Sequence, residues 1–221
     1  MDKYYSLTKT LIISGIQCEK KLWFDLNDKI KLKDKAIFRS GNRFNDVVRK
    51  HYGEGLDLSD EKEHQIVIER TKEAIQSDNI NVIYEAGFLF KKTFIRADVL
   101  IKKDNQWTML EAKASTSVKD INISDLAIQS FIVKNSGLDV TCNKIIHINK
   151  EFIYKGDENY KDLVVEVDIT KEVLAEENEV EHLINKFLPL KKSDCPKKEI
   201  GSHCKDPYPC NYIDKCSPPD T

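Results

Sequence analysis

Residues 96–113 read RADVLIKKDNQWTMLEAK, and this stretch decides the fold. Two runs of β-branched, aromatic and aliphatic residues flank the polar segment KKDNQ, which is typical of a turn. The pattern predicts a β-hairpin that brings Asp98, near the end of the first strand, close to Glu111 in the second. Residues two apart in a strand share a face, so Glu111 and Lys113 are expected to point the same way.

Asp98, Glu111 and Lys113 together suggest a metal site. Two carboxylates and an ammonium are costly to bury together unless a cation and an anion bind there. Two carboxylates suit Mg²⁺ or Mn²⁺, hard cations that prefer oxygen ligands. Lys113 would then orient or deprotonate the attacking water and offset charge on a phosphate. The alternative is coincidence, because 33% of the residues are charged.

The whole chain, residues 1–221, is expected to form one domain with three parts. Residues 1–78 carry apolar residues at helical spacing and predict helices. Residues 79–190 contain strand-like runs and two helical patterns, which predict a mixed central sheet flanked by helices. Residues 191–221 shift to Pro, Lys and Cys, an irregular cysteine-rich tail. A domain of this length can bury about 70% of its unfolded surface without disulfides.

Within these parts, periodicity and turn residues set the expected element bounds. Ser124 is the expected N-cap of the helix that follows the hairpin, and Gly137 its stop. The expected helices are residues 6–26 (broken at Cys18), 36–53, 61–77, 124–137 and 171–190, and the expected strands are residues 81–90, 92–101, 106–114, 143–156 and 162–170.

The order of these residues resembles the PD-(D/E)XK nuclease superfamily. Asp98 and Glu111-Ala-Lys are followed by DLAIQ (residues 125–129), and the chain ends in HCKDPYPCNYIDKC (residues 203–216). More narrowly, the chain resembles RecB/AddB-type and CRISPR-associated exonucleases that carry an iron–sulfur cluster. It is most similar to a bacterial family with a DxxxQ segment and a C-terminal HCxxPYxCxxxxxC. The resemblance covers residues 7–216 and implies a restriction-endonuclease-like α/β core.

The resemblance also implies roles for individual residues. Asp98, Glu111 and the carbonyl of Ala112 would hold Mg²⁺ or Mn²⁺, while Lys113 and Gln129 would act beside them on the phosphodiester.

Two further side chains are candidates for the metal site, and two positions depart from the related enzymes. Glu85, an acidic residue in the preceding strand, and Asn45 are the further candidates. Related exonucleases place a histidine ligand where this chain has Asn45, and a tyrosine where it has Val133. Whether one or two metal ions bind therefore stays open. A catalytically silent, nuclease-like module that only binds nucleic acid is the alternative function.

Three cysteines in the tail favour a second metal site, because clustered thiols of a reducing cytoplasm more often bind metal than form disulfides. They are Cys204, Cys210 and Cys216. The resemblance supplies Cys18 as the fourth ligand of a [4Fe–4S] cluster, which four thiolates can hold. Such a cluster would tie the first helix to the tail, and by analogy with a disulfide it would contribute about 4 kcal/mol.

Zinc is the alternative metal for the tail. Cys195 and the three later cysteines could form a local site, with His203 as a further ligand. Zinc modules usually begin with cysteines two to four residues apart, which these are not. A zinc-stabilised binding domain is accordingly a third hypothesis for the function.

Net charge and hydropathy limit the kinds of partner that the sequence predicts. The formal net charge of −2 is no argument for a nucleic-acid partner, so positive charge would have to be concentrated locally. No run of eighteen apolar residues occurs, so no membrane partner is expected. The first residues lack the pattern of a leader peptide, and a cytoplasmic location is expected. The local clusters of positive charge are Lys20 and Lys21, then Lys91, Lys92 and Arg96, then Lys191, Lys192, Lys197 and Lys198.

The expected function is a divalent-metal-dependent DNA nuclease, an exonuclease that acts on DNA ends or single strands. DNA repair, CRISPR-type and defence processes all fit this activity. No GxxxxGK[ST] motif is present, so a helicase or another repair or CRISPR protein would have to supply any motor.

Overall fold

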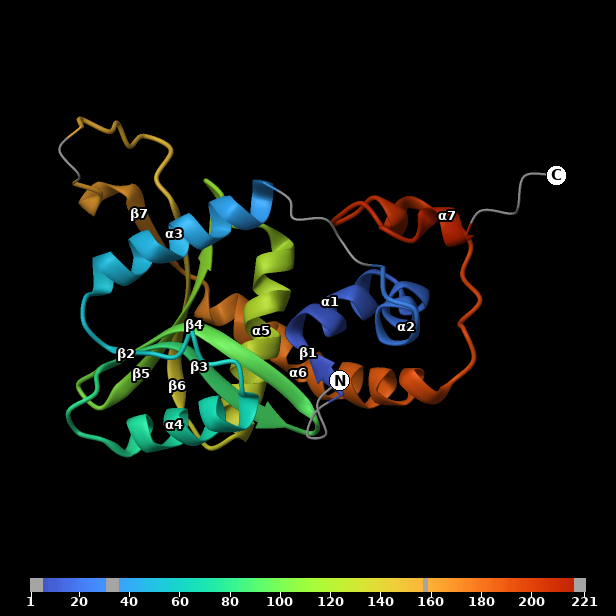
Figure 1. Ribbon diagram of the computed structural model, residues 1–221, viewed down its shortest axis with the longest axis horizontal. Helices are drawn as coiled ribbons and strands as arrows, with labels where there is room; N and C mark the ends of the chain where they lie inside the picture. Colours follow the sequence, from blue (N-terminus) through green and yellow to red (C-terminus); the bar gives the residue numbers. More distant parts are fainter. Residues whose placement is uncertain (1–5, 31–35, 157–158, 217–221) are drawn as a thin grey trace.

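The computed structural model describes residues 6–30, 36–156 and 159–216 and has a mixed β-sheet at its centre (Figure 1). The sheet has seven strands in the order β2-β3-β4-β5-β6-β7, and β1 pairs with β4 outside this path. The strands are β1 (Leu7–Thr8), β2 (Leu56–Asp57), β3 (Val82–Phe90), β4 (Thr93–Lys103), β5 (Gln106–Lys113), β6 (Val140–Ile148) and β7 (Val164–Asp168).

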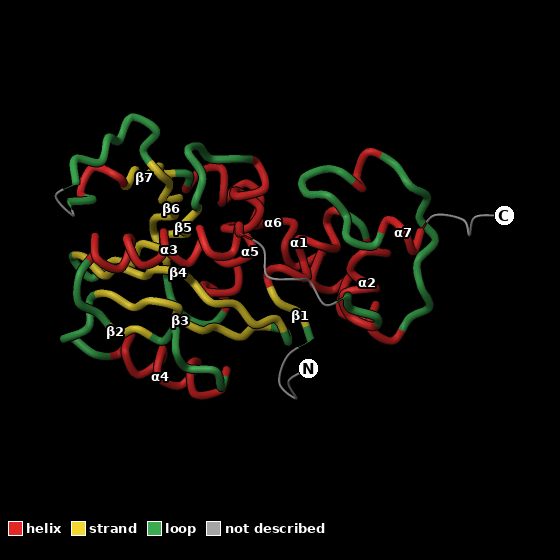
Figure 2. Tube along the Cα trace, turned by 45° about the horizontal axis from the view of Figure 1, so that its top comes forward, coloured by secondary structure: helices red, strands yellow, loops and turns green. Residues whose placement is uncertain are grey.

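Helices flank this sheet, which confirms the prediction of an α/β fold with a mixed sheet. Figure 2 shows α3 and α4 on opposite sides of the sheet, and α1 and α2 beyond β1. The helices are α1 (Lys9–Gln17), α2 (Glu19–Asn27), α3 (Ala36–Tyr52), α4 (His64–Gln76), α5 (Asp120–Asn135), α6 (Thr170–Phe187) and α7 (Ile213–Cys216), with short 3₁₀ turns η1 (Lys161–Leu163), η2 (Leu188–Lys192) and η3 (Ser202–Cys204).

Two tight hairpins build the centre of the sheet. Phe90 pairs with Thr93 and Lys103 with Gln106, so each hairpin turns through two residues. After β5, the helix α5 crosses over so that β6 pairs in parallel with β5. This strand–helix–strand unit brings α5 back over the β4–β5 hairpin, which positions the candidate site.

Two hydrophobic clusters hold the helices on the sheet. The larger joins α1, α5 and α6 to the strands and includes Ile128, Ile132 and Phe187. In the smaller, Phe44 and Val48 of α3 pack against strand residues. Burial at about 25 cal/mol per Å² of apolar surface makes these contacts the main source of stability.

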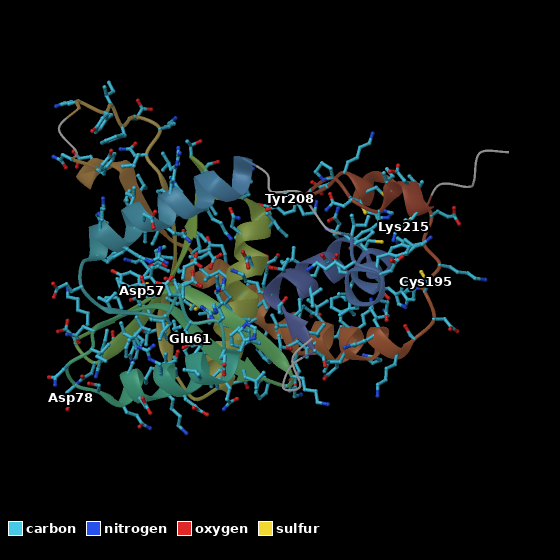
Figure 3. The ribbon with its side chains drawn as sticks, in the orientation of Figure 1. Asp57, Glu61, Asp78, Cys195, Tyr208 and Lys215 are labelled. Atoms are coloured by element: carbon cyan, nitrogen blue, oxygen red, sulfur yellow. The ribbon has the colours of Figure 1, made fainter. Side chains whose placement is uncertain are left out.

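The tail packs on the α1–α2 pair through side chains distant in sequence. Gln17 Nε2 donates to the carbonyls of His203 (2.7 Å) and Tyr208 (2.6 Å). The Tyr212 ring stacks on Phe24 with centroids 5.1 Å apart. Figure 3 shows Tyr208 and Lys215 on the segment that lies over α1 and α2. The expected irregular tail therefore contains two short turns of helix, η3 and α7, that rest on the N-terminal helices.

The bounds of several predicted elements differ from those observed. The helix after the hairpin begins at Asp120, not after Ser124, because the Asn122 side chain accepts from the Lys119 N–H at 3.0 Å and caps an earlier turn. Gly137 does end it, with a φ of 99°. The strand predicted over residues 143–156 ends at Ile148.

Three other differences concern α4 and the edge strands. The helix predicted from residue 61 begins at His64. The two-residue strands β1 and β2 were not predicted, because two residues carry no periodicity.

Candidate active site

The β4–β5 hairpin places the predicted carboxylates in one region. Asp98 Oδ2 accepts from the backbone N–H of Ala112, its neighbour across the hairpin, at 2.8 Å. Burial and the negative charge of Glu111 raise the pKa of Asp98 to about 8. The two carboxyl groups therefore lie close enough to interact strongly, as the sequence predicts.

Glu111 is buried, with 2% of its surface exposed, and each of its oxygens has a partner. Lys113 Nζ lies 2.6 Å from Oε1, and Gln129 Nε2 of α5 donates to Oε2 at 2.7 Å. Burial alone would raise the pKa of Glu111, but the neighbouring ammonium groups outweigh it and hold that pKa well below its usual range. Glu111 is thus an anion fixed in one orientation.

Lys113 is held between two carboxylates. Its Nζ lies 2.5 Å from Asp125 Oδ2 on α5 as well as against Glu111. Burial lowers the pKa of Lys113, but the charges of Glu111 and Asp125 outweigh it and raise that pKa above its usual value. Asp125, which has no predicted role beyond the DLAIQ segment, therefore belongs to the site.

Lys9 is a site residue that the sequence did not reveal. Its Nζ lies 2.8 Å from Glu111 Oε1 and 3.3 Å from Asp125 Oδ1. Burial lowers the pKa of Lys9, but the Asp125 and Glu111 charges outweigh it and raise that pKa above the usual value. One sequence signal was present: Lys9 is the first residue of α1, where the helix dipole disfavours a cation.

Glu85 and Asn45 lie next to Asp98. All three line a cavity of about 10 Å³ between β3, β4 and α3, which has room for roughly one water molecule or ion. Burial raises the pKa of Glu85 above its usual value. The structure thus brings Asn45, Glu85, Asp98 and Ala112 to one cavity, while Glu111, Lys113 and Gln129 bind one another beside it. Among the described residues, the carboxylates here do not include three that are spaced as ligands to a single ion.

The backbone is irregular at the same point. Glu85 lies within β3 but has a φ of 56°, a conformation that costs a non-glycine residue about 1–3 kcal/mol. Tyr84 packs in the smaller hydrophobic cluster, whereas Ala86 packs in the larger one. Residues two apart normally share a face, so the alternation of β3 shifts at Glu85. Such strain concentrates at functional sites, where the surroundings hold it in place.

The four cysteines proposed as cluster ligands line one cavity between α2 and the tail. They are Cys18, Cys204, Cys210 and Cys216. Burial raises the pKa of the Cys210 thiol, and the nearby Cys204 and Cys18 contribute in the same direction. Cys18 also separates α1 from α2, and its N–H donates to the Ser14 carbonyl at 2.9 Å.

The alternative zinc ligands are placed differently. Cys195 is exposed in the first part of the tail (Figure 3) and is not among the residues lining this cavity. His203 does line it, and its Nε2 lies 3.6 Å from Cys204 Sγ. Among the residues that the structure describes, no three His, Cys, Asp or Glu side chains have the spacing of ligands to a single ion.

Comparison with known proteins assigns no family to this chain. No protein-family model and no curated protein sequence matches it. A solved structure, the crystal structure of SSO0001, aligns with 83% of this chain and 78% of its own, at 11% identity and a TM-score of 0.33. A likeness at that level supports no inference about fold or function. In the described part of the chain, no helix has the length and apolar character needed to cross a membrane.

Proposed function

We propose that this chain is a divalent-metal-dependent deoxyribonuclease of the PD-(D/E)XK type, an exonuclease that acts on DNA ends or single strands. The observation that carries the proposal is an excess of negative charge around the β4–β5 hairpin. Two ammonium groups, those of Lys9 and Lys113, face four carboxyl groups. The carboxyl groups are those of Glu85, Asp98, Glu111 and Asp125.

This surplus of carboxyl groups favours a cation. Arg96 of β4 and Arg49 of α3 offset part of the negative charge of Glu85. Arg49 is also paired with Asp57 at 2.9 Å, and Arg96 donates to the Leu58 and Glu61 carbonyls. The pKa of Asp98, about 8, means that this carboxyl group holds a proton at neutral pH when no metal neutralises the pocket. An oxygen-rich site with surplus negative charge suits Mg²⁺ or Mn²⁺.

The residues fit the roles that such a site needs. Asp98, Glu111 and the Ala112 carbonyl would hold the ion, with Glu85 and Asn45 beside it. When bound, the ion would supply Lewis acidity at the phosphate and lower the pKa of the attacking water.

The chain's own side chains would position the substrate and balance its charge. The Lys113 ammonium, fixed by Glu111 and Asp125, is placed to offset charge that develops on a phosphate. The Gln129 amide, fully buried, holds the Glu111 carboxylate in one orientation. Both interactions exist before substrate binds, so the site would need little reorganisation.

A nuclease assay tests the proposal. Single-stranded and duplex DNA, labelled at either end, would be incubated with the full chain in Mg²⁺, in Mn²⁺ or in EDTA. We expect metal-dependent cleavage that starts at an end, and losses of at least about 100-fold in Asp98→Asn and Glu111→Gln. Glu166→Gln, which alters a carboxylate paired with Lys144 on the same sheet, is the matched control. Cleavage that persists in both site variants would refute the proposal.

One observation favours the second candidate, a silent nucleic-acid-binding module. Lys9 and Lys113 already contact the buried Glu111 carboxylate, so this part of the site is satisfied without a metal. Fluorescence anisotropy on labelled DNA separates the two. DNA binding by the wild-type chain without cleavage in any metal would support the silent module, whereas turnover excludes it.

We also propose that the tail and α1–α2 hold a [4Fe–4S] cluster through Cys18, Cys204, Cys210 and Cys216. The support is that these four thiols line one cavity although 185 residues or more separate the first from the others. When bound, the cluster would cross-link the two ends of the domain. The cavity is only about 10 Å³, so cluster binding would move the tail away from α2.

Metal analysis of protein purified without oxygen tests this second site. About four iron and four sulfide per chain, with a brown colour, would support the cluster. Zinc in their place would instead support a zinc-stabilised tail.

A further inference from the structure

Four lysines line a groove next to the tip of the β3–β4 hairpin. The groove has a volume of about 490 Å³, and Leu188 and Pro189 form its apolar part. Lys91 is ion-paired with Glu181 of α6. The lysines, called the lysine groove below, are Lys91, Lys92, Lys191 and Lys192.

The hairpin turn that carries two of these lysines is unusual. Lys91 and Lys92 both have positive φ angles, 43° and 58°. Two-residue turns with this pattern strongly favour Asn-Gly or Asp-Gly, because other side chains rarely adopt it. The neighbouring β4–β5 turn has the same pattern and carries Asp104 and Asn105, as expected. The two lysines of the first turn therefore occupy a backbone conformation that disfavours them, which points to a use for their charge.

The backbone of β1 and β4 connects the lysine groove to the candidate active site. The backbone carbonyl of Lys92 accepts from the N–H groups of Ser6 and Leu7. Ser6 lines the groove, and Lys9, three residues further, contacts Glu111. Lys92 and Asp98 are six residues apart on one strand, or about 20 Å at 3.3 Å per residue.

We propose that the lysine groove binds the phosphate backbone of the nucleic-acid substrate, on one side of the cleavage site. The inference rests on the proposed nuclease function and names the surface that holds the uncleaved part of the chain. A separation of about 20 Å corresponds to roughly six base pairs at 3.4 Å per step along one strand. The groove supplies affinity and not base specificity, because lysines contact phosphates as point charges.

The double variant Lys91→Asn/Lys92→Gly tests the proposal. It removes two positive charges but installs the residues that this turn prefers, so the variant should melt at or above the wild-type temperature. Binding of a fluorescent DNA oligonucleotide, and of an RNA of the same sequence, would be measured across a salt series. Each lost phosphate contact should reduce the salt slope by about 0.7–0.9 and affinity at 0.1 M salt by roughly 5- to 8-fold. We expect the double variant to bind about 25- to 60-fold more weakly.

Asp104→Asn/Asn105→Gly is the control for the backbone change, because it installs the same Asn-Gly pair in a turn whose two central residues are not lysines. It should leave the salt slope unchanged. Hydrolysis of bis(p-nitrophenyl) phosphate, which is too small to reach the groove, should be equal in all three proteins. If the wild type binds and cleaves nucleic acid but the lysine variant keeps its affinity and salt slope, the groove inference fails alone. If the wild type neither binds nor cleaves, the proposed function fails with it.

Discussion

Replacing Asp98 with Asn should stabilise the metal-free protein and abolish its stabilisation by metal. The Asn side chain keeps an oxygen that can accept from the Ala112 N–H, so the hairpin contact at 2.8 Å can persist. The change removes one carboxyl group from a pocket in which burial and the Glu111 charge already raise the pKa of Asp98 to about 8. Without a bound cation, the repulsion between these carboxylates destabilises the folded protein, and the raised pKa of Asp98 indicates that this residue accounts for much of the destabilisation.

The size of the effect follows from the pKa. A shift from 3.8 to about 8, at 1.36 kcal/mol per unit, sets an upper bound of roughly 6 kcal/mol. Asp98 is only half-buried, and effective dielectric constants near 20 weaken such interactions, so we expect about 2 kcal/mol. For a chain of this length that corresponds to about 4–8 °C in Tm. Metal at a hundred times its Kd should add about 2.7 kcal/mol to the wild type and little to the variant.

The sign of the pH dependence provides a sharper check. An acid whose pKa is raised on folding costs nothing below its unfolded pKa, and its cost grows as pH rises toward the folded pKa. The stability gap between Asp98→Asn and wild type in EDTA should therefore be near zero at about pH 4 and widen up to about pH 8.

Thermal unfolding in EDTA and in Mn²⁺ across this pH range measures both effects. Asp78→Asn, a change at a fully exposed carboxylate, is the control and should show neither. A constant gap across the range, or equal Mn²⁺ stabilisation of variant and wild type, would contradict the reasoning.

Three further changes have defined outcomes. Gln129→Met removes the donor to Glu111 Oε2 at 2.7 Å, so we expect cleavage to fall about 10- to 100-fold with little change in substrate affinity, as separate kcat and KM values would show. Gly15→Ala should destabilise the protein by about 1–3 kcal/mol in urea unfolding, because a Cβ there would lie 2.6 Å from the Phe187 ring, and Gly41→Ala, with open space around it, is the control. Cys204→Ser should lower the iron content of protein purified without oxygen and its Tm, while Cys195→Ser changes neither.

Sequence periodicity was sufficient to predict the strands and the crossover helix at the centre of the fold. The three strands of the meander and the crossover helix have strong local patterns, and two of the turns between them are short and polar. The short strands β1 and β2 were missed because the sheet, and not their own sequence, makes them strands. The N-cap of α5 was misplaced by five residues because Ser124 and Lys119 both precede apolar residues, and only the Asn122 contact decides between them.

The sequence predicted the part of the candidate site that lies on the β4–β5 hairpin and on α5. Asp98, Glu111 and Lys113 lie on the two strands of one hairpin, β4 and β5. Gln129 follows on α5, the helix that crosses over this hairpin. Spacing alone places such residues together when the connections are short. Asp125 was seen but not assigned, because its contact with Lys113 depends on the rotation of α5 about its axis, and no pattern in residues 120–135 fixes that rotation.

The contact between Lys9 and Glu111 could not be predicted from sequence spacing, because the two residues are 102 positions apart. Its position depends on β1, whose two residues pair with the start of β4 and aim the first turn of α1 at the carboxylates. A lysine in that turn opposes the helix dipole, at a cost of about 0.3–1 kcal/mol, and no acidic residue of the same turn offsets it. The carboxylates of Glu111 on β5 and Asp125 on α5 offset this cost by pairing with Lys9. An unfavourable charge at the start of a helix thus indicated a partner distant in sequence. The same reasoning applies to Lys91 and Lys92 in their unfavourable turn, where Lys91 pairs with the exposed Glu181 and we propose that a phosphate supplies the main compensation.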